Sequence, residues 1–293
     1  MPTKKNKKQE HTPLPGRPGV LYVIATPIGN LEDITLRAVR ILGEVDVIAA
    51  EDTRHTRKLL AHLGISTPLV SYFKDKEQAR SEKIIRMLLT GRQVGLVSDA
   101  GTPGISDPGA ILVKAALEAG IRVIPIPGPS ALTAALCVAG FPDTSFVFLG
   151  FLPSRATARR LLLNSLRQEE RDLVFYESPR RLAASLAQCL EILGDRQVFW
   201  ARELTKLHEE LRTAQLTELA AEVAGREIKG ESVLIVKGAA PVAPPPATDL
   251  TAALRWHHEQ DYTLKEAVQR VSRDLGLPRS QVYQEALAIW NNR

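Results

Sequence analysis

The twelve residues from Ser98 to Gly109, "SDAGTPGISDPG", follow the apolar run "VGLV" and precede the helical run "AILVKAALEAG". A strand and the next helix are usually joined by about two to six residues, so this Gly- and Pro-rich loop is longer than the chain path requires. A second stretch, "IPGPSAL", places Ser130 and Ala131 at the start of another helix. Both loops offer backbone amides and small side chains to a flat, mostly neutral ligand such as an adenosine. One such loop would more often only shape a turn, but two on one edge predict a ligand site.

The ends of these loops also carry helix signals. Asp107 followed by Pro108 has the pattern of a helix N-cap and a first helical residue, so we expect the helix to begin there.

The chain contains neither a G-x-G-x-x-G fingerprint nor a Walker P-loop. Because pyrophosphate needs bare glycine amides at a helix N-terminus, NAD, FAD and nucleoside triphosphates are not expected as ligands.

Three acidic residues at predicted strand ends are candidates for a general base. Glu51 and Asp52 end the second apolar run, and Glu177 ends a strand in the second half of the chain. Each also has an arginine within a few residues and could equally be an ion-paired structural acid. The six histidines show no metal-ligand spacing, so we expect no metal. Cys137 and Cys189 lie in apolar helical patterns and are expected to be reduced core thiols.

The elements that must position these residues alternate between Val- and Ile-rich runs and helical patterns. Over residues 19–142, five such pairs predict an α/β domain whose mainly parallel sheet has helices on both faces and ligands at the carboxyl ends of its strands. Over residues 143–238, four further apolar runs separated by helical patterns predict a second α/β domain with a mixed sheet.

The two ends of the chain have a different composition. Residues 1–18 are expected to form a disordered basic tail, residues 239–248 a Pro/Ala linker, and residues 249–293 a small helical module that resembles a helix-turn-helix. The first 19 residues contribute +4 to the net charge of +5. The basic tail could attract the phosphates of a nucleic acid or could simply be a solvated segment. The C-terminal helical module could bind nucleic acid or could be a small helical bundle with a purely structural role. Without a signal peptide or an apolar run of membrane-spanning length, we expect a cytoplasmic protein with no membrane contact.

Seven motifs in order along residues 19–238 closely resemble the tetrapyrrole-methylase superfamily, and within it the branch that acts on ribosomal RNA. They are "LYVIATPIGNLEDITLRA", "AAEDTR", "SDAGTPGISDPG", "IPGPSAL", "FYESPRRL", "ARELTKLHEE" and "GESVLIVKG". The resemblance implies a homodimer with S-adenosylmethionine as methyl donor in a cleft between two α/β domains. It also implies methylation of a cytidine 2′-hydroxyl in the decoding region of 16S rRNA, with that RNA or the small ribosomal subunit as partner. The first loop reads "TPIGN", whereas the branch that makes tetrapyrroles usually has glycines there, which disfavours a porphyrinoid substrate.

The same resemblance, carried over motif by motif, implies a set of residues that contact the donor. They are Pro27, Asp99, Gly101, Ile105, Ser130, Ala131, Tyr176 and Glu231. Cations at the motif ends are expected to hold RNA, namely Arg54, Arg180 and Arg202, and Lys206 is expected to orient the ribose in the catalytic site. Two alternatives stay open: a small-molecule methylase of tetrapyrrole type on the same fold, and a non-catalytic RNA-binding assembly factor.

Overall fold

The structure is a computed structural model that describes residues 18–73, 77–141, 145–240, 250–260 and 262–290. It divides into two compact units, residues 1–239 and 240–293. The predicted basic tail, apart from residue 18, and most of the predicted linker lie outside the described residues. The boundaries expected for these two segments therefore stay predictions.

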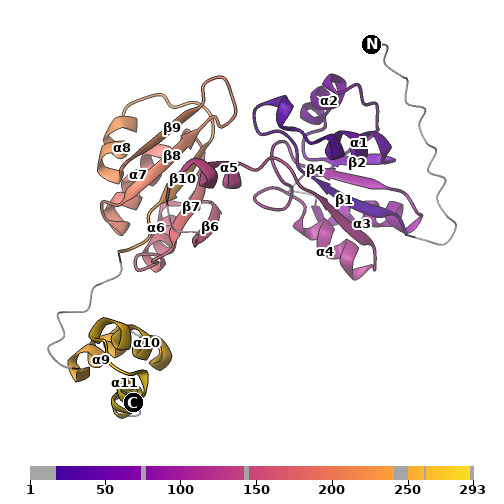
Figure 1. The fold of residues 1–293 in the computed structure, drawn as a ribbon. Helices are drawn as coiled ribbons and strands as arrows, with labels where there is room; N and C mark the ends of the chain where they lie inside the picture. The colour runs from indigo at the N-terminus through magenta and orange to yellow at the C-terminus, as the bar shows by residue number, and fades with distance from the viewer. Residues whose placement is uncertain (1–17, 74–76, 142–144, 241–249, 261, 291–293) are drawn as a thin grey trace. The chain divides into compact units, whose positions relative to one another are not determined.

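The first half of unit 1 is a parallel sheet of five strands in the order β3-β2-β4-β1-β5. Its strands are β1 (Val20–Ile24), β2 (Val47–Ala50), β3 (Leu69–Ser71), β4 (Val94–Val97) and β5 (Arg122–Ile126). Its helices are α1 (Leu36–Glu44), α2 (Thr53–His62), α3 (Glu77–Leu89) and α4 (Ala110–Glu118), with a short 3-10 turn, η1, at Leu31–Asp33. Helices α1 and α2 cover one face and α3 and α4 the other (Figure 1).

The alternation of side chains along the strands builds a core on each face of this sheet. In β1, for example, Leu21 packs with α3 and α4, whereas Ile24 packs with α1 and α2. Every residue of β2 and β4 is buried. Strands covered on both faces need such continuous apolar runs, which is why the sequence predicted a parallel sheet here.

The second half of unit 1 is a mixed sheet of five strands in the order β6-β7-β10-β8-β9. Its strands are β6 (Phe146–Phe151), β7 (Asp172–Glu177), β8 (Gln197–Arg202), β9 (Glu210–Gln215) and β10 (Ser232–Val236). Its helices are α5 (Ala131–Val138), α6 (Ala156–Ser165), α7 (Leu182–Leu193) and α8 (Leu216–Val223). Only β6 and β7 pair in parallel, and the other neighbours are antiparallel.

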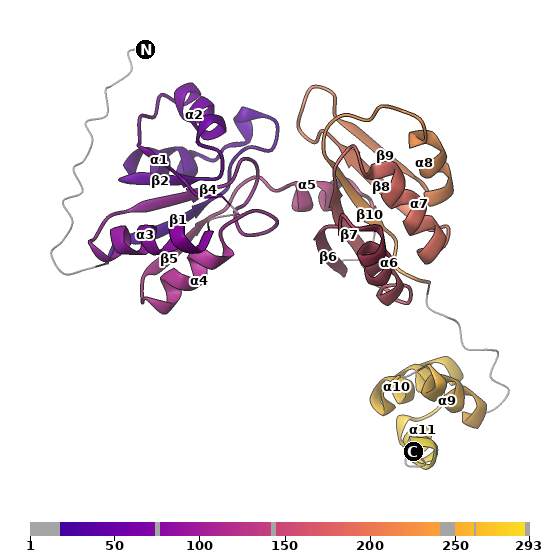
Figure 2. The same ribbon diagram turned by 180° about the vertical axis from the view of Figure 1, so that it is seen from behind.

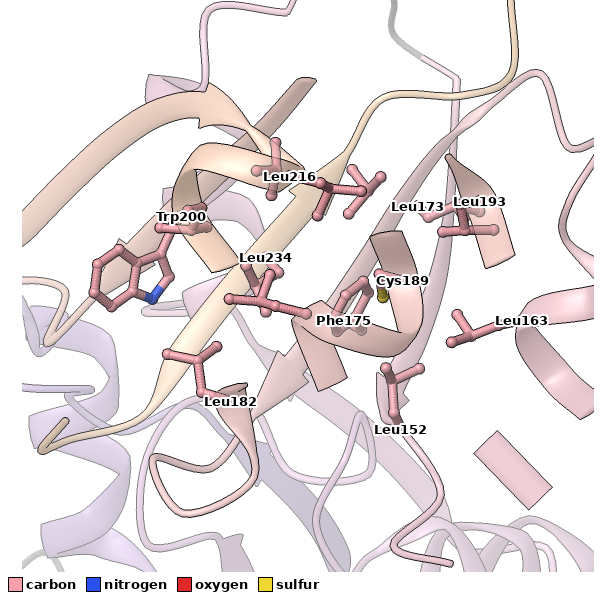
Figure 3. Close-up of a cluster of buried hydrophobic side chains, with 14 of the residues drawn as sticks. Leu152, Leu163, Leu173, Phe175, Leu182, Cys189, Leu193, Trp200, Leu216 and Leu234 are labelled. Atoms are coloured by element: carbon pink, nitrogen blue, oxygen red, sulfur yellow. The ribbon is translucent and has the colours of Figure 1, made fainter. Parts of the chain in front are cut away.

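The two faces of this sheet are covered by different helices, as seen from behind in Figure 2. Alternate residues such as Phe175 and Trp200 pack with α6, α7 and α8, and Figure 3 shows this cluster. Their neighbours, including Val174 and Phe199, pack with α5 on the opposite face. Trp200 is fully buried and donates its Nε1 hydrogen to the Ser232 hydroxyl at 2.9 Å, so its polar atom has a partner.

Strand β9 was absent from the sequence prediction because it lies at the sheet edge and exposes most of its side chains. Ala214 is its only buried residue, so the segment "ELRTAQ" lacks an apolar alternation.

The described residues of unit 2 form three helices around a small core of their own. They are α9 (Leu250–Glu259), α10 (Leu264–Leu275) and α11 (Arg279–Trp290). The sequence predicted α10 and α11, whereas α9 was missed. Thr263 and Glu266 form a capping box at the start of α10, and Gly276 ends it in the left-handed conformation with φ 64°.

Two local predictions were wrong. Helix α4 starts at Ala110 with Gly109 as its N-cap, two residues later than expected. Cys137 is exposed because α5 buries only Ala135 and turns the cysteine outward, whereas Cys189 is buried as predicted. Burial raises the pKa of the Cys189 thiol to about 12, which keeps it protonated and inert.

None of the helices in the described ranges has the length and apolar character needed to cross a membrane.

Candidate active site

A pocket of about 260 Å³ lies between the carboxyl ends of the first-sheet strands and the second sheet. The first-sheet side consists of Ile28 after β1, Glu51 after β2, the loop after β4 and the start of α5. The opposite wall includes Phe151, Tyr176 and the segment around Glu231. This volume is close to the lower end of the range for small-molecule sites, roughly 300 to 1,000 Å³.

The glycine-rich loop after β4 forms the floor of the pocket and is tied to its neighbours by backbone bonds. The amides of Thr26 and Gly101 each donate to the other's carbonyl at 2.9 Å, and the Thr102 hydroxyl donates to the Pro129 carbonyl at 3.2 Å. Gly101 has φ 77°, a region that side chains with a Cβ rarely adopt. The loops after β1, β4 and β5 therefore form one continuous surface whose shape requires a glycine.

Asp107 lines this pocket and does not cap α4 as predicted. The amide of Gly109, the actual N-cap, donates to Oε1 of Glu77 on α3 at 2.8 Å, so a carboxylate from another helix satisfies the α4 terminus. The neighbouring Ser106 hydroxyl is buried on the pocket wall and has no hydrogen-bond partner among the described residues. A buried hydroxyl without a partner is costly, and a bound ligand could supply the missing bond.

The pocket is strongly acidic. Five carboxylates line it: Glu51, Asp99, Asp107, Glu203 and Glu231. Partial burial raises the pKa of Glu51, and the charges of Asp107 and Asp99 raise it further. Burial also raises the pKa of Asp107, with added repulsion from Glu231 and Asp99. The pocket therefore favours a ligand that carries positive charge.

Lys206 is the one basic side chain on the pocket walls formed by the described residues, and its ammonium contacts a Glu203 carboxylate oxygen at 2.7 Å. No group of three or more His, Cys, Asp or Glu side chains that could hold a metal occurs in the described part of the chain.

Tyr176 joins the two sides of the pocket. Its hydroxyl accepts a hydrogen bond from the Leu132 amide, in the first turn of α5, at 3.1 Å. Its ring lies edge-on to Phe148 and Phe151, with centroid distances of 5.1 and 5.5 Å. Burial raises the pKa of the Tyr176 hydroxyl, so it remains a neutral hydrogen-bonding group near neutral pH.

Comparison with known families matches residues 20–220 to the tetrapyrrole (corrin/porphyrin) methylases. The chain belongs to this family. A relative from Synechocystis sp., named ribosomal RNA small subunit methyltransferase I, is 46% identical over 274 residues, which cover 92% of this chain and 98% of that protein. A relative of the same name from Thermotoga maritima is 49% identical over 220 residues, covering 75% of this chain and 99% of that protein.

Solved structures of methylases share the fold at low sequence identity. The methyltransferase CobJ superposes with a TM-score of 0.59 at 20% identity, covering 76% of this chain and 95% of CobJ. A uroporphyrin-III C-methyltransferase from Thermus thermophilus, complexed with S-adenosylhomocysteine, superposes with a TM-score of 0.54 at 21% identity, covering 75% of this chain and 97% of that one. At these identities the similarity establishes the tetrapyrrole-methylase fold alone.

Most of the donor-contact residues that the family motifs implied gather in the pocket. The following line it: Asp99, Gly101, Ile105, Ser130, Ala131, Tyr176 and Glu231. Pro27 lies outside the wall that the described residues form, and its neighbour Ile28 lies on it instead. That these residues bind a methyl donor remains a proposal.

The three candidate bases occupy different environments in this tetrapyrrole methylase. Glu51 lines the pocket. Asp52 instead caps α2, where its Oδ1 accepts from the Arg54 amide at 2.8 Å and its Oδ2 contacts the Arg54 guanidinium at 3.1 Å. Bonds from the Arg54 side chain and then its amide lower the pKa of Asp52, which makes this carboxylate a weaker base.

Glu177 is absent from the pocket wall defined by the described residues, because consecutive residues of a strand point to opposite faces. Tyr176 takes the pocket face of β7, so Glu177 points to the α7 side, where it is fully buried. There it accepts bonds from the Ser178 amide at 2.8 Å, Arg181 Nε at 2.6 Å and the Ser185 hydroxyl at 2.6 Å. This arrangement favours a structural role for Glu177 over proton abstraction.

The predicted RNA-binding arginines lie outside the pocket walls as far as the described residues define them. Arg54 is exposed and paired with Asp52, and Arg180 is exposed. Arg202 is partly buried and its Nη2 contacts Glu210 at 2.8 Å. Their contacts with RNA stay predictions.

Several pocket residues were not selected from the sequence. They are Ile28, Thr102, Ser106, Asp107, Phe151, Glu203, Leu204, Ser232, Ala100, Ala201 and Val233. Glu203 lies within "ARELTKLHEE", so that motif carried a usable signal. Phe151 ends an edge strand remote from the motifs, and nothing in its sequence context indicates a site.

Proposed function

We propose that this protein transfers a methyl group from S-adenosylmethionine to ribosomal RNA of the small ribosomal subunit, at the 2′-hydroxyl of a cytidine in the decoding region of 16S rRNA. The observation that carries the proposal is the alignment over nearly the whole length of relatives named ribosomal RNA small subunit methyltransferase I. The acidic pocket formed by the family motifs supports it. A ribosomal substrate also favours a cytoplasmic location.

The residues present fit this donor. When bound, S-adenosylmethionine supplies a methyl group already activated on a positively charged sulfur. The carboxylates of Asp99 and Glu231 favour positive charge, and carboxylates also accept hydrogen bonds from ribose and ammonium groups. Gly101 leaves backbone accessible, and the Ser106 hydroxyl, which has no partner in the described part of the chain, provides a further hydrogen-bonding group.

The remaining chemical task is to orient the accepting hydroxyl and receive its proton. In-line placement supplies much of the rate acceleration through proximity. Of the three candidate bases, Glu51 is the one that lines the pocket, and its raised pKa makes it a stronger base than an ordinary glutamate. Lys206, held by Glu203, is placed to contact the ribose or its phosphate.

A second copy of the chain completes the proposal. Strand β6 lies at an edge of the second sheet, and its first residue, Phe146, is 39% exposed. On α5, Val138 is 50% exposed. An apolar edge strand and an apolar helix face are covered well by a copy of themselves, so a homodimer is expected. Light scattering of wild type and Val138→Asp should show a dimer and a monomer, respectively.

The test of the activity uses labelled donor with small ribosomal subunits, free 16S rRNA and a tetrapyrrole precursor. We expect label in the RNA at an alkali-resistant 2′-O-methylcytidine. Asp99→Ala and Ser130→Arg should abolish donor binding in calorimetry while the thermal melt is nearly unchanged. Label in the tetrapyrrole alone would establish the small-molecule alternative. Donor binding with no transfer to any substrate would favour the assembly-factor alternative.

A further inference from the structure

The loop from Glu203 to Glu209, between β8 and β9, has an unusual backbone. Among the described residues, Glu203 with φ 52° and Thr205 with φ 65° are the only non-glycine residues at positive φ. Such conformations cost about 1 to 3 kcal/mol each and persist only where the surroundings hold them. The chain thus maintains a strained loop beside the pocket, where it contributes the wall residues Glu203, Leu204 and Lys206.

Specific hydrogen bonds hold this loop. The Thr205 hydroxyl accepts a bond from the Asn30 amide at 3.0 Å, which ties the loop to the segment after β1. The Thr205 amide donates to Oε2 of Glu209 at 2.7 Å. The Glu203 amide donates to the Glu231 carbonyl at 3.3 Å.

Two glycines allow the loop to approach its neighbours closely. A Cβ at Gly29 would collide with Lys206 and Thr205, and a Cβ at Gly230 would collide with the Glu203 carboxylate. The loop therefore lies close against its neighbours at both glycines, and the Glu203 carboxylate bonds the Lys206 ammonium at 2.7 Å.

The loop displays two exposed side chains beside Lys206. Leu207 is 93% exposed, and His208 beside it is also exposed. A single exposed leucine means little on a mobile surface. On a strained, bonded loop that also carries Lys206 into the pocket, an exposed leucine next to an ammonium donor matches a partner with an apolar face and oxygen acceptors. A nucleotide has both, in its base and in its ribose and phosphate oxygens.

We infer that residues 203–209 form a preformed clamp for the accepting nucleotide of the RNA, an inference that rests on the proposed function. Lys206 contacts the phosphate or ribose oxygen beside the accepting hydroxyl, and Leu207 packs on the face of the unstacked base. Glu203 and Thr205 are positioning residues, because they set the place of Lys206 and Leu207 without contacting the RNA.

Steady-state kinetics of the full chain with small ribosomal subunits tests the clamp. Leu207→Ala and Lys206→Met should each raise KM for the subunit roughly ten- to a hundredfold, the range expected for losing one well-buried apolar or charged contact. Donor affinity, measured by calorimetry, should stay within about twofold of wild type for Leu207→Ala because that side chain lies outside the pocket wall of the described residues. Matched controls are Leu117→Ala and Lys114→Met on α4, where Leu117 is 61% exposed and Lys114 pairs with Glu118 at 3.8 Å. Both controls should leave KM unchanged.

The positioning role has its own readout. Thr205→Val removes the hydroxyl that accepts from Asn30 and should raise KM for the subunit, whereas Thr205→Ser keeps the hydroxyl and should restore it. A general loss of folding would instead lower the melting temperature and the donor affinity of the valine variant.

Three results would overturn the clamp. If wild type methylates subunits and both Leu207→Ala and Lys206→Met keep its KM, the loop does not hold RNA although the proposed function stands. If Leu207→Ala changes the oligomeric mass and not KM, the leucine belongs to a contact between copies. If wild type transfers no methyl group to subunits or free RNA, the proposed function fails first and the clamp fails with it.

Discussion

Replacing Glu177 by glutamine separates a structural carboxylate from a catalytic one. The substitution keeps the shape of the side chain and removes its charge. In the fold, this fully buried carboxylate accepts bonds from the Ser178 amide, Arg181 Nε and the Ser185 hydroxyl. Glutamine Oε1 can still accept the first two bonds as a neutral acceptor, and the Ser185 hydroxyl must turn to accept from the new amide group.

The expected cost follows from these three bonds. A hydrogen bond to a charged group contributes about 1.5 to 3 kcal/mol and a neutral one about 0.5 to 1.5 kcal/mol, so each bond loses about 1 kcal/mol. The three together reduce the free energy of unfolding by about 3 kcal/mol. Breaking a buried ion pair costs roughly 3 to 5 kcal/mol, and the value expected here lies at the low end of that range. The reason is that Arg181 keeps 26% of its side chain exposed, so water can hydrate its charge once the carboxylate is gone. For a unit of this size, about 2–4 °C per kcal/mol gives a fall in Tm of about 6–12 °C.

The assay measures the thermal melt and, well below Tm, the turnover with small ribosomal subunits. We expect Glu177→Gln to lower Tm by this amount and to keep kcat within a few-fold of wild type. The matched control is Glu51→Gln in the pocket, which should keep Tm and lower kcat by about two to four orders of magnitude if Glu51 is the base. A Glu177→Gln protein with unchanged Tm and a hundredfold lower kcat would refute the structural assignment.

Three further predictions concern pH and domain roles. Burial and neighbouring carboxylates raise the pKa of Glu51 and of Asp107, so protonation removes negative charge from the pocket at a higher pH than it would for ordinary carboxylates. Donor affinity measured by calorimetry should therefore fall as pH decreases toward the carboxylate range, and Glu51→Gln should flatten this dependence. His257 is buried, and neither of its ring nitrogens has a hydrogen-bond partner among the described residues. Burial lowers the pKa of its ring, so folded unit 2 binds fewer protons than the unfolded form does. Its stability should therefore drop as pH falls below about 6.5, seen as faster hydrogen exchange in α10, and His257→Phe should remove the effect. A chain truncated to residues 19–238 should bind the donor as wild type does and methylate subunits poorly; wild-type methylation would show that the tail and unit 2 are dispensable.

The sequence by itself predicted the elements that depend on local pattern. Apolar runs alternating with helical repeats predicted the parallel sheet, because strands buried on both faces must be apolar throughout. Parallel strands bring their carboxyl ends to one edge, so residues that follow different strands, such as Asp99 and Ser130, were expected at one site. Both line the pocket.

Only the tertiary structure decided which side chain of a strand end faces that site. Tyr176 and Glu177 are consecutive residues of β7, and each side chain carries a polar group. The way β7 pairs with β10 in the sheet turns Tyr176 toward the pocket and Glu177 toward the core on the opposite face. Asp107 has a capping pattern in sequence, yet Glu77, thirty residues earlier in α3, bonds the α4 N-cap and leaves Asp107 to the pocket. Both outcomes depend on partners distant in the chain, and local spacing carries no information about contacts of that kind.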